Sequence, residues 1–229
     1  MSTPPPPAGW YADPQAPARW RWWDGARWTD QVSDPAGTES ALMSADYLVV
    51  RASARLARWN ATIHDRSLAQ IGSVVQTGMQ LRILDAAGAL VLQADGGSTI
   101  SWSRSTVLPD WTVRDAAGTQ LGAMAVTKYF NRRLTVTLRG VDGADVGRLE
   151  PIGKVDHDFS IADAAGTGVA RVWRAERERA LFNEDETWAA QIARPIPPPL
   201  DSLTLVGVCT LDAIQHVVLN RHSSHRSSF

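Results

Sequence analysis

The feature that most constrains this chain is an apolar run near its C-terminus, PPPLDSLTLVGVCTLDAIQHVVLNR, from Pro197 to Arg221. The three prolines stop any element before them, and Asp201 or Ser202 is suited to cap a helix that continues to about Leu219. A helix of about 20 residues is long enough to cross a bilayer. The run is therefore either a membrane span or an apolar helix that the rest of the chain encloses.

Polar residues within this run favour enclosure. Asp212 lies past the middle of the helix and would cost about 3 kcal/mol in lipid, whereas each Leu, Ile or Val returns only a few tenths. On a helical wheel Asp212, Gln215 and His216 fall on the same side as Asp201. We therefore expect a buried helix over 200–219 whose C-terminal half meets water at the mouth of the enclosing fold. A single-span membrane protein anchored by the same residues is the alternative.

Short β-prone runs separated by recurring turns precede the helix. The tetrapeptide Asp-Ala-Ala-Gly occurs at three places: 85–88, 115–118 and 163–166. Asp and Gly suit tight turns because Asp bonds to nearby backbone N–H groups and Gly adopts positive φ. A glycine also stands in the strand after several turns: Gly72, Gly122 and Gly147. The pattern predicts a meander of antiparallel hairpins, in which RVWRAERERALF (171–182) is a strand end followed by a charged loop.

A long antiparallel sheet followed by one apolar helix predicts a barrel. Open antiparallel sheets expose their edges, and closure removes them. A barrel of about ten or more strands is too wide for its own side chains to fill. We expect a mainly β fold, in which residues 46–219 form a closed antiparallel β-barrel around a central apolar C-terminal helix, with a flexible tail over 220–229.

Composition excludes some classes of function. The chain has 23 basic and 24 acidic residues, so its overall charge gives no reason to expect nucleic acid as a partner. Its one cysteine, Cys209, cannot form an internal disulfide and lies in the apolar run, which indicates a packing role in a reducing compartment. The start, MSTPPPPAG, lacks the basic and apolar regions of a secretory signal, so we expect a cytoplasmic protein.

A second, smaller unit is expected at the N-terminus. After a Pro-rich tail (1–8), residues 9–32 hold half of the 10 tryptophans. Asp24 and Gly25 are typical of a two-residue hairpin turn between aromatic strands. We expect a small Trp-rich β-hairpin module over 9–32, joined to the barrel by a linker over 33–45.

Pairing across the predicted turn assigns the faces of this Trp-rich module. Trp22 would lie opposite Arg27, as a cation–π pair, and Trp20 would share their face. Trp23 and Trp28 would share the other face. Trp20, Trp22 and Arg27 are the candidate surface for a partner, which could be a membrane, a sugar or a Pro-rich peptide.

The order of parts in residues 46–219 resembles the phospholipid scramblase family and its relatives in the tubby-like C-terminal domain superfamily. D-x-x-G turns, the aromatic strand ETWAAQI and a Pro-Leu-Asp element before an apolar helix follow one another as in those relatives. The ending carries the resemblance at Pro199, Leu200, Asp201, Gly207, Cys209, Leu211 and Asp212. The resemblance implies a closed barrel around a hydrophobic helix and an association with membrane phospholipid.

The same resemblance raises the question of calcium. The eukaryotic scramblases carry an acidic calcium segment before the helix and a Cys-rich stretch for palmitoylation. This chain has no Cys-rich stretch. Its acidic cluster there is Glu184, Asp185 and Glu186, without the alternating oxygen ligands of a calcium loop. These three residues are weak calcium candidates, and no other cofactor is expected.

The N-terminal segment resembles a short family of bacterial Trp-rich modules with G-W-Y-x-D-P, then R-W-W-D-G and W-T. The matching residues are Gly9, Trp10, Tyr11, Asp13, Pro14, Arg21, Trp22, Trp23, Asp24, Gly25, Trp28 and Thr29. Such modules often accompany membrane-associated domains, and the resemblance implies no activity of its own.

No pattern indicates an enzyme. The chain has no G-x-S-x-G, P-loop, G-x-G-x-x-G, H-E-x-x-H or C-x-x-C sequence. The five histidines are scattered, and His157, between two aspartates, is best explained as a solvated strand end. We expect a non-enzymatic protein.

The stretch best suited to a lipid headgroup is KYFNRR. Lys128, Arg132 and Arg133 stand beside two aromatic residues, a composition that suits an anionic phosphate at a membrane interface. A hairpin loop with solvated charges is the simpler alternative. Our functional hypothesis is a scramblase-related protein at the inner face of the plasma membrane that binds or moves anionic phospholipid. The competing hypothesis is a soluble scaffold whose Trp-rich module recruits a protein partner.

Overall fold

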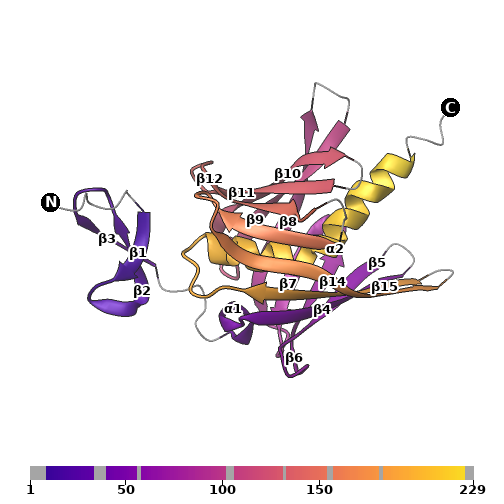
Figure 1. Cartoon of the computed structure of the whole chain (residues 1–229), viewed down its shortest axis with the longest axis horizontal. Coiled ribbons are helices and arrows are strands. Elements are labelled where there is room, and N and C mark those ends of the chain that lie inside the picture. Colours follow the sequence, from indigo (N-terminus) through magenta and orange to yellow (C-terminus); the bar gives the residue numbers. More distant parts are fainter. Residues whose placement is uncertain are drawn as a thin grey trace.

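The main body of the chain is a closed antiparallel barrel that surrounds the C-terminal helix (Figure 1). The computed structural model describes residues 9–33, 40–55, 58–101, 106–130, 133–153, 157–180 and 183–224. The barrel strands are β4 (Tyr47–Arg55), β5 (Arg58–His64), β6 (Gln70–Thr77), β7 (Gln80–Asp85), β8 (Leu90–Ser101), β9 (Thr106–Asp115), β10 (Gln120–Phe130), β11 (Arg133–Gly140), β12 (Asp145–Pro151), β13 (Asp158–Asp163), β14 (Gly168–Ala180) and β15 (Asn183–Ile192). Each strand pairs with its neighbours in sequence, and β15 pairs with β4 to close the barrel. The predicted fold class is confirmed.

The N-terminal module is a separate three-stranded sheet (Figure 1). Its strands are β1 (Gly9–Asp13), β2 (Ala16–Trp23) and β3 (Trp28–Ser33), in the order β1-β2-β3. The predicted hairpin corresponds to β2 and β3. Strand β1, which the prediction did not contain, pairs with the other edge of β2.

Five turns at one end of the barrel share one backbone pattern. In the turn after β7, for example, Asp85 N–H donates to Ala89 O, and Gly88 N–H donates to Asp85 O. The same pair of bonds recurs after β5, β9, β11 and β13. In four of the turns an aspartate Oδ1 also accepts the N–H four residues on: Asp65, Asp85, Asp115 and Asp163. Side-chain capping thus explains why the Asp-Ala-Ala-Gly sequences form turns.

The fourth residue of these turns has positive φ. Glycine occupies this position in four of them: Gly88, Gly118, Gly143 and Gly166. In the turn after β5 the residue is Leu68, with φ of 64°. A leucine in this left-handed region carries a steric cost of roughly 1–2 kcal/mol that glycine avoids.

Glycines in the strands let the helices approach the sheet. A Cβ at Gly147 would lie 2.8 Å from Leu200 Cδ1 and 2.7 Å from Ala162 O. A Cβ at Gly122 would clash with Arg139 O and lie 3.2 Å from Leu203 Cδ1. The glycines therefore provide the space in which leucines from the central helix pack.

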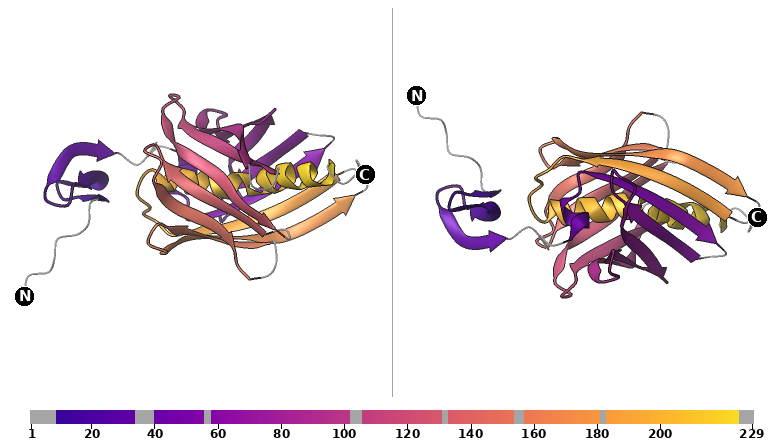
Figure 2. Two further views of the ribbon diagram at one scale, coloured as in Figure 1. Left: turned by 90° about the horizontal axis from the view of Figure 1, so that it is seen from above. Right: turned by 90° about the horizontal axis from the view of Figure 1, so that it is seen from below.

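Helix α2 (Leu200–Ser224) runs through the barrel, as the view from above shows (Figure 2). It is buried at every position over 200–215, which confirms the predicted central helix. Asp201 and Ser202 lie within its first turn rather than at the cap, and Asp201 Oδ1 accepts the Ser202 N–H at 2.6 Å. Among the helices that the structure describes, none combines the length and apolarity that a membrane span requires.

The C-terminal half of this helix differs from the prediction. We expected Asp212 and Gln215 to meet water at the barrel mouth, but they are only 4% and 8% exposed. Asp212 is buried because two indole N–H groups from the barrel wall bond to its carboxylate. His216, expected beside them, has no described side chain.

Two segments have more regular structure than the sequence suggested. The charged run through Ala180 is not a loop but the second half of β14. There the backbone of β14 pairs with β15 in register as far as Ala180, which lies opposite Asn183. In the segment expected as a linker, α1 (Ala41–Ser44) buries Leu42 against the barrel end.

Candidate functional site: a groove around Arg51

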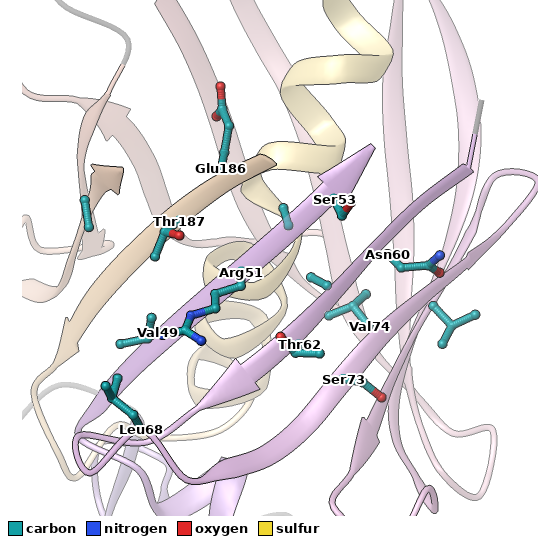
Figure 3. A pocket seen from close by; sticks show the side chains of 14 residues that line it. Val49, Arg51, Ser53, Asn60, Thr62, Leu68, Ser73, Val74, Glu186 and Thr187 are labelled. Carbon is teal, nitrogen blue, oxygen red and sulfur yellow. The ribbon is translucent and has the colours of Figure 1, made fainter. Parts of the chain in front are cut away.

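An open groove crosses the outer face of β4, β5, β6 and β15. Its volume is about 740 Å³. Fourteen residues line it (Figure 3): Val49, Arg51, Ala52, Ser53, Asn60, Ala61, Thr62, Leu68, Ser73, Val74, Val75, Ala175, Glu186 and Thr187. We call it the Arg51 groove.

Strand register places polar side chains in a row along the floor of the Arg51 groove. Arg51 on β4 pairs with Thr62 on β5 and with Thr187 on β15. Thr62 in turn pairs with Ser73 on β6. Because alternate residues of a strand face opposite sides, the residues next to them in sequence point into the core, as buried Val50 and Ala61 do. The row Thr187, Arg51, Thr62 and Ser73 therefore belongs to the outer face.

Apolar side chains form one end of the Arg51 groove. Val49 lies two residues before Arg51 on the same face of β4 and is 8% exposed. Leu68, in the turn between β5 and β6, is 55% exposed. Figure 3 shows the Arg51 side chain extending along β4 toward Val49 and the turn that carries Leu68. The groove thus combines a cation, hydroxyl groups and an apolar end.

The guanidinium of Arg51 is available for a ligand. Arg51 is exposed, and within the described ranges no hydrogen bond or ion pair engages it. Four other exposed arginines of the barrel pair with carboxylates: Arg66 with Asp46, Arg139 with Asp145, Arg148 with Glu150 and Arg171 with Asp158. Arg82 on β7 resembles Arg51, since it is exposed and has no such partner among the described residues. In the same groove Ser53 Oγ is buried and has no hydrogen-bond partner among the described residues. A guanidinium suits a phosphate or carboxylate because it can donate two parallel hydrogen bonds.

A second polar cluster lies inside the barrel. Trp59 Nε1 donates to Asp212 Oδ2 at 2.5 Å, and Trp188 Nε1 donates to Asp212 Oδ1 at 3.4 Å. The Arg174 guanidinium lies over the Trp188 ring, 4.8 Å from its centroid. Arg174 Nε is 3.1 Å from Glu186 Oε2, and this carboxylate is 4% exposed. These contacts join α2 to β5, β14 and β15, which indicates that the cluster holds the helix in place.

Of the three acidic calcium candidates, the structure describes the side chain of Glu186 alone, so calcium binding stays a prediction. Glu186 points to Arg174, which already compensates its charge. The side chains of Glu184 and Asp185 lie outside the described residues. Among the residues that the structure does describe, no group of three or more His, Cys, Asp or Glu side chains could hold a metal ion.

The predicted headgroup cluster remains a prediction. Lys128 and Arg133 belong to β10 and β11, where Phe130 pairs with Arg133 at the end of a hairpin. Their side chains, and Arg132 entirely, lie outside the described residues. The structure therefore does not show whether the three cations share a face.

The turn of the Trp-rich module is longer than predicted. Trp23 pairs with Trp28, so four residues form the loop instead of two. Asp24 Oδ1 accepts the N–H groups of Ala26 and Arg27, at 2.8 Å each, which stabilises the longer turn. The Arg27 bond, followed by that of Ala26, lowers the pKa of Asp24.

The longer turn changes the predicted surface of the module. Arg27 lies in the loop beside Asp24, with its side chain 84% exposed, so the expected strand pair of Trp22 and Arg27 is wrong. Trp20 and Trp22 are half-buried. The shared face of Trp23 and Trp28 is confirmed, since their rings meet edge to face with centroids 5.3 Å apart.

Sequence reasoning missed Arg51 and Leu68. Arg51 gave no signal, because the barrel closure that sets Thr187 beside it joins distant segments. Leu68 did give one. The sequence DRSLA repeats the turn pattern of DAAGA, and its fourth residue is leucine where the other copies have glycine.

Comparison with known proteins assigns the N-terminal segment. Residues 8–41 match a family described as "Protein of unknown function (DUF2510)". This match covers the Trp-rich module and ends before the first barrel strand. No curated protein matches the chain.

Two solved structures resemble the chain. One is the X-ray structure of an Arabidopsis thaliana protein, with 18% identity, a TM-score of 0.47, and coverage of 74% of this chain and 93% of that one. The other is a DUF1329 family protein from Desulfovibrio piger, with 8% identity, a TM-score of 0.25, and coverage of 72% and 96%. Neither likeness supports an argument about function.

Proposed function

We propose that this protein binds the surface of anionic phospholipid membranes without catalysing a reaction. The observation that carries the proposal is the Arg51 groove. It sets an exposed guanidinium, unpaired within the described residues, among hydroxyl groups and next to apolar side chains. A phospholipid offers the complementary chemistry, since its phosphate is anionic and its glycerol and acyl parts are apolar.

Each part of the groove has a role in this proposal. Arg51 would donate to the phosphate, and the hydroxyl group of Thr187 would bond to one of its remaining oxygens or to the headgroup. The Thr62 hydroxyl lies 3.0 Å from His64 Nε2 and already has this partner. Val49 would contact the apolar part of the lipid. One cation near a charged leaflet contributes about 1 kcal/mol, so stable binding needs further contacts. The KYFNRR cluster is our candidate for some of them.

The resemblance to scramblase-related proteins agrees with this proposal. The closed barrel around a central helix is the architecture that the resemblance implies. We propose membership of that group, and peripheral attachment at the inner face of the plasma membrane, as parts of the same hypothesis. We favour lipid binding over lipid movement because the strands enclose the described core of α2 on all sides.

Sedimentation with vesicles tests the proposal. The vesicles are phosphatidylcholine alone or mixed with phosphatidylserine, each with and without calcium. We expect binding to the anionic vesicles only, reduced about fivefold in Arg51→Ser, since about 1 kcal/mol corresponds to that factor. Arg148→Ser is the matched control, because it removes one exposed cation from β12, across the barrel. Equal binding by the two variants would contradict a role for the groove.

A second variant tests the KYFNRR cluster separately. In it Lys128, Arg132 and Arg133 are all changed to serine. If the cluster contributes, the triple variant binds anionic vesicles more weakly than the wild type. Combining it with Arg51→Ser should then lower the affinity further, by the sum of the two separate losses in binding free energy. Unchanged affinity would assign these charges to solvent.

The scaffold hypothesis also has an observation in its favour. Trp28 and Val32 of the Trp-rich module are 38% and 39% exposed, so β3 offers apolar surface for a protein partner. We expect Trp28→Ser to leave vesicle binding unchanged if the barrel carries the function. If Trp28→Ser loses vesicle binding and Arg51→Ser binds vesicles like the wild type, the Trp-rich module carries the binding and the Arg51 groove does not.

A further inference from the structure

The turn between β5 and β6 retains an unfavourable residue. Its fourth position has positive φ, which glycine satisfies in the four equivalent turns and which leucine satisfies poorly. Burial does not compensate for the strain, because the Leu68 side chain is 55% exposed. Backbone strain that nothing in the fold requires is a reason to look for a function.

This strained residue lies at the Arg51 groove. Leu68 is one of the lining residues, at the end toward which the Arg51 side chain extends (Figure 3). The turn itself is firmly held: Asp65 Oδ1 accepts bonds from Ser67 and Ala69, and the pKa of Asp65 is lowered chiefly by the Ser67 hydroxyl. A rigid turn therefore presents an exposed leucine beside an available cation.

We propose that Leu68 is a membrane anchor that inserts into the bilayer whose anionic headgroup Arg51 binds. This inference rests on the proposed function. It adds Leu68 as a contact residue, an orientation of the barrel on the membrane, and an apolar contribution to the membrane affinity. The cation and the apolar side chain complement the two layers of a leaflet, charged headgroups outside and acyl chains beneath. The barrel would thus meet the membrane with the end of β5 and β6 that carries this turn.

A contrast with the opposite end of β6 supports the orientation. Met79, in the turn between β6 and β7, is also partly exposed, at 39%, but it is not among the lining residues of the Arg51 groove. Its turn has glycine, Gly78, at the position of positive φ. Met79 is therefore a control for exposed apolar surface outside the Arg51 groove, in a turn where glycine takes the positive φ.

Leu68→Gly separates anchoring from folding. Glycine relieves the strain, so the urea midpoint of this variant should equal or exceed that of the wild type. Its affinity for phosphatidylserine-containing vesicles should fall about tenfold, as expected for losing a buried leucine contact. Leu68→Asn, which tolerates positive φ and is polar, should behave in the same way. Met79→Ser should bind like the wild type.

A fluorescent label tests insertion directly. Cys209 is buried, so Leu68→Cys introduces one accessible thiol for a polarity-sensitive dye. We expect its emission to shift to shorter wavelength on anionic vesicles, and no shift for a dye on Met79→Cys.

The outcomes are distinguishable. If Leu68→Gly binds vesicles as well as the wild type, or the dye at position 68 does not shift, Leu68 is not an anchor, and the headgroup function of Arg51 stands on its own test. If the wild type binds no vesicle, the proposed function and this inference both fail.

Discussion

Replacing Asp212 with alanine should destabilise the protein strongly. The change removes the acceptor of two indole N–H groups, on Trp59 and Trp188, which are 4% and 1% exposed. Water has little access to either donor. A buried donor left without a partner costs about 1–3 kcal/mol, so the two together cost about 2–6 kcal/mol. Domains are commonly stable by only about 5–15 kcal/mol, so this loss is a large share.

Urea denaturation followed by far-ultraviolet circular dichroism measures the effect. Asp212→Asn keeps one oxygen acceptor and should lose about half as much, while a double-mutant cycle with Trp59→Phe should show non-additivity. Thr210→Val is the control, because among the described residues this buried hydroxyl bonds only to Val206 O in its own helix. A loss below about 1 kcal/mol for Asp212→Ala, with an unchanged m-value, would refute the idea that the indoles hold the helix.

Three further predictions concern the central helix. Gly147→Ala should lower stability by about 1–3 kcal/mol, measured as a lower Tm, because its Cβ would overlap Leu200 Cδ1 at 2.8 Å. Burial raises the pKa of Asp201 above 3.8. Its contribution to the free energy of unfolding is therefore complete below pH 3.8 and is lost as the pH rises through the folded pKa. Asp201→Asn should flatten this decline when the free energy of unfolding is measured against pH. Burial also raises the pKa of the Cys209 thiol, so a maleimide should react with it only in denaturant; rapid reaction of the native protein would contradict the packing.

Local chemistry explains which parts of the fold could be predicted. The Asp-Ala-Ala-Gly turns follow from hydrogen bonds within five residues, and the central helix follows from one continuous apolar run. The burial of Asp212 could not be predicted, because its partner Trp59 lies 153 residues away in sequence. A carboxylate in an apolar helix is compatible with either a wet mouth or a buried acceptor, and only the tertiary fold distinguishes them.

The candidate site was harder to predict for the same reason. The Arg51 groove depends on the pairing of β4 with β15, which brings Thr187 beside Arg51 only when the barrel closes. In the Trp-rich module the error was smaller and local. Asp24 bonds to two successive N–H groups and so extends the turn by two residues, which a two-residue turn signal does not reveal.

The position of α2 after all the barrel strands has a consequence for biosynthesis. The ribosome makes β4 to β15 before the helix that fills them, so a nascent chain holds a nearly complete set of strands with no apolar filling. Unpaired strands with exposed apolar faces are prone to aggregate. The nascent protein should therefore depend on chaperones until the helix emerges, and a stalled chain ending before Leu200 should be degraded rather than accumulate.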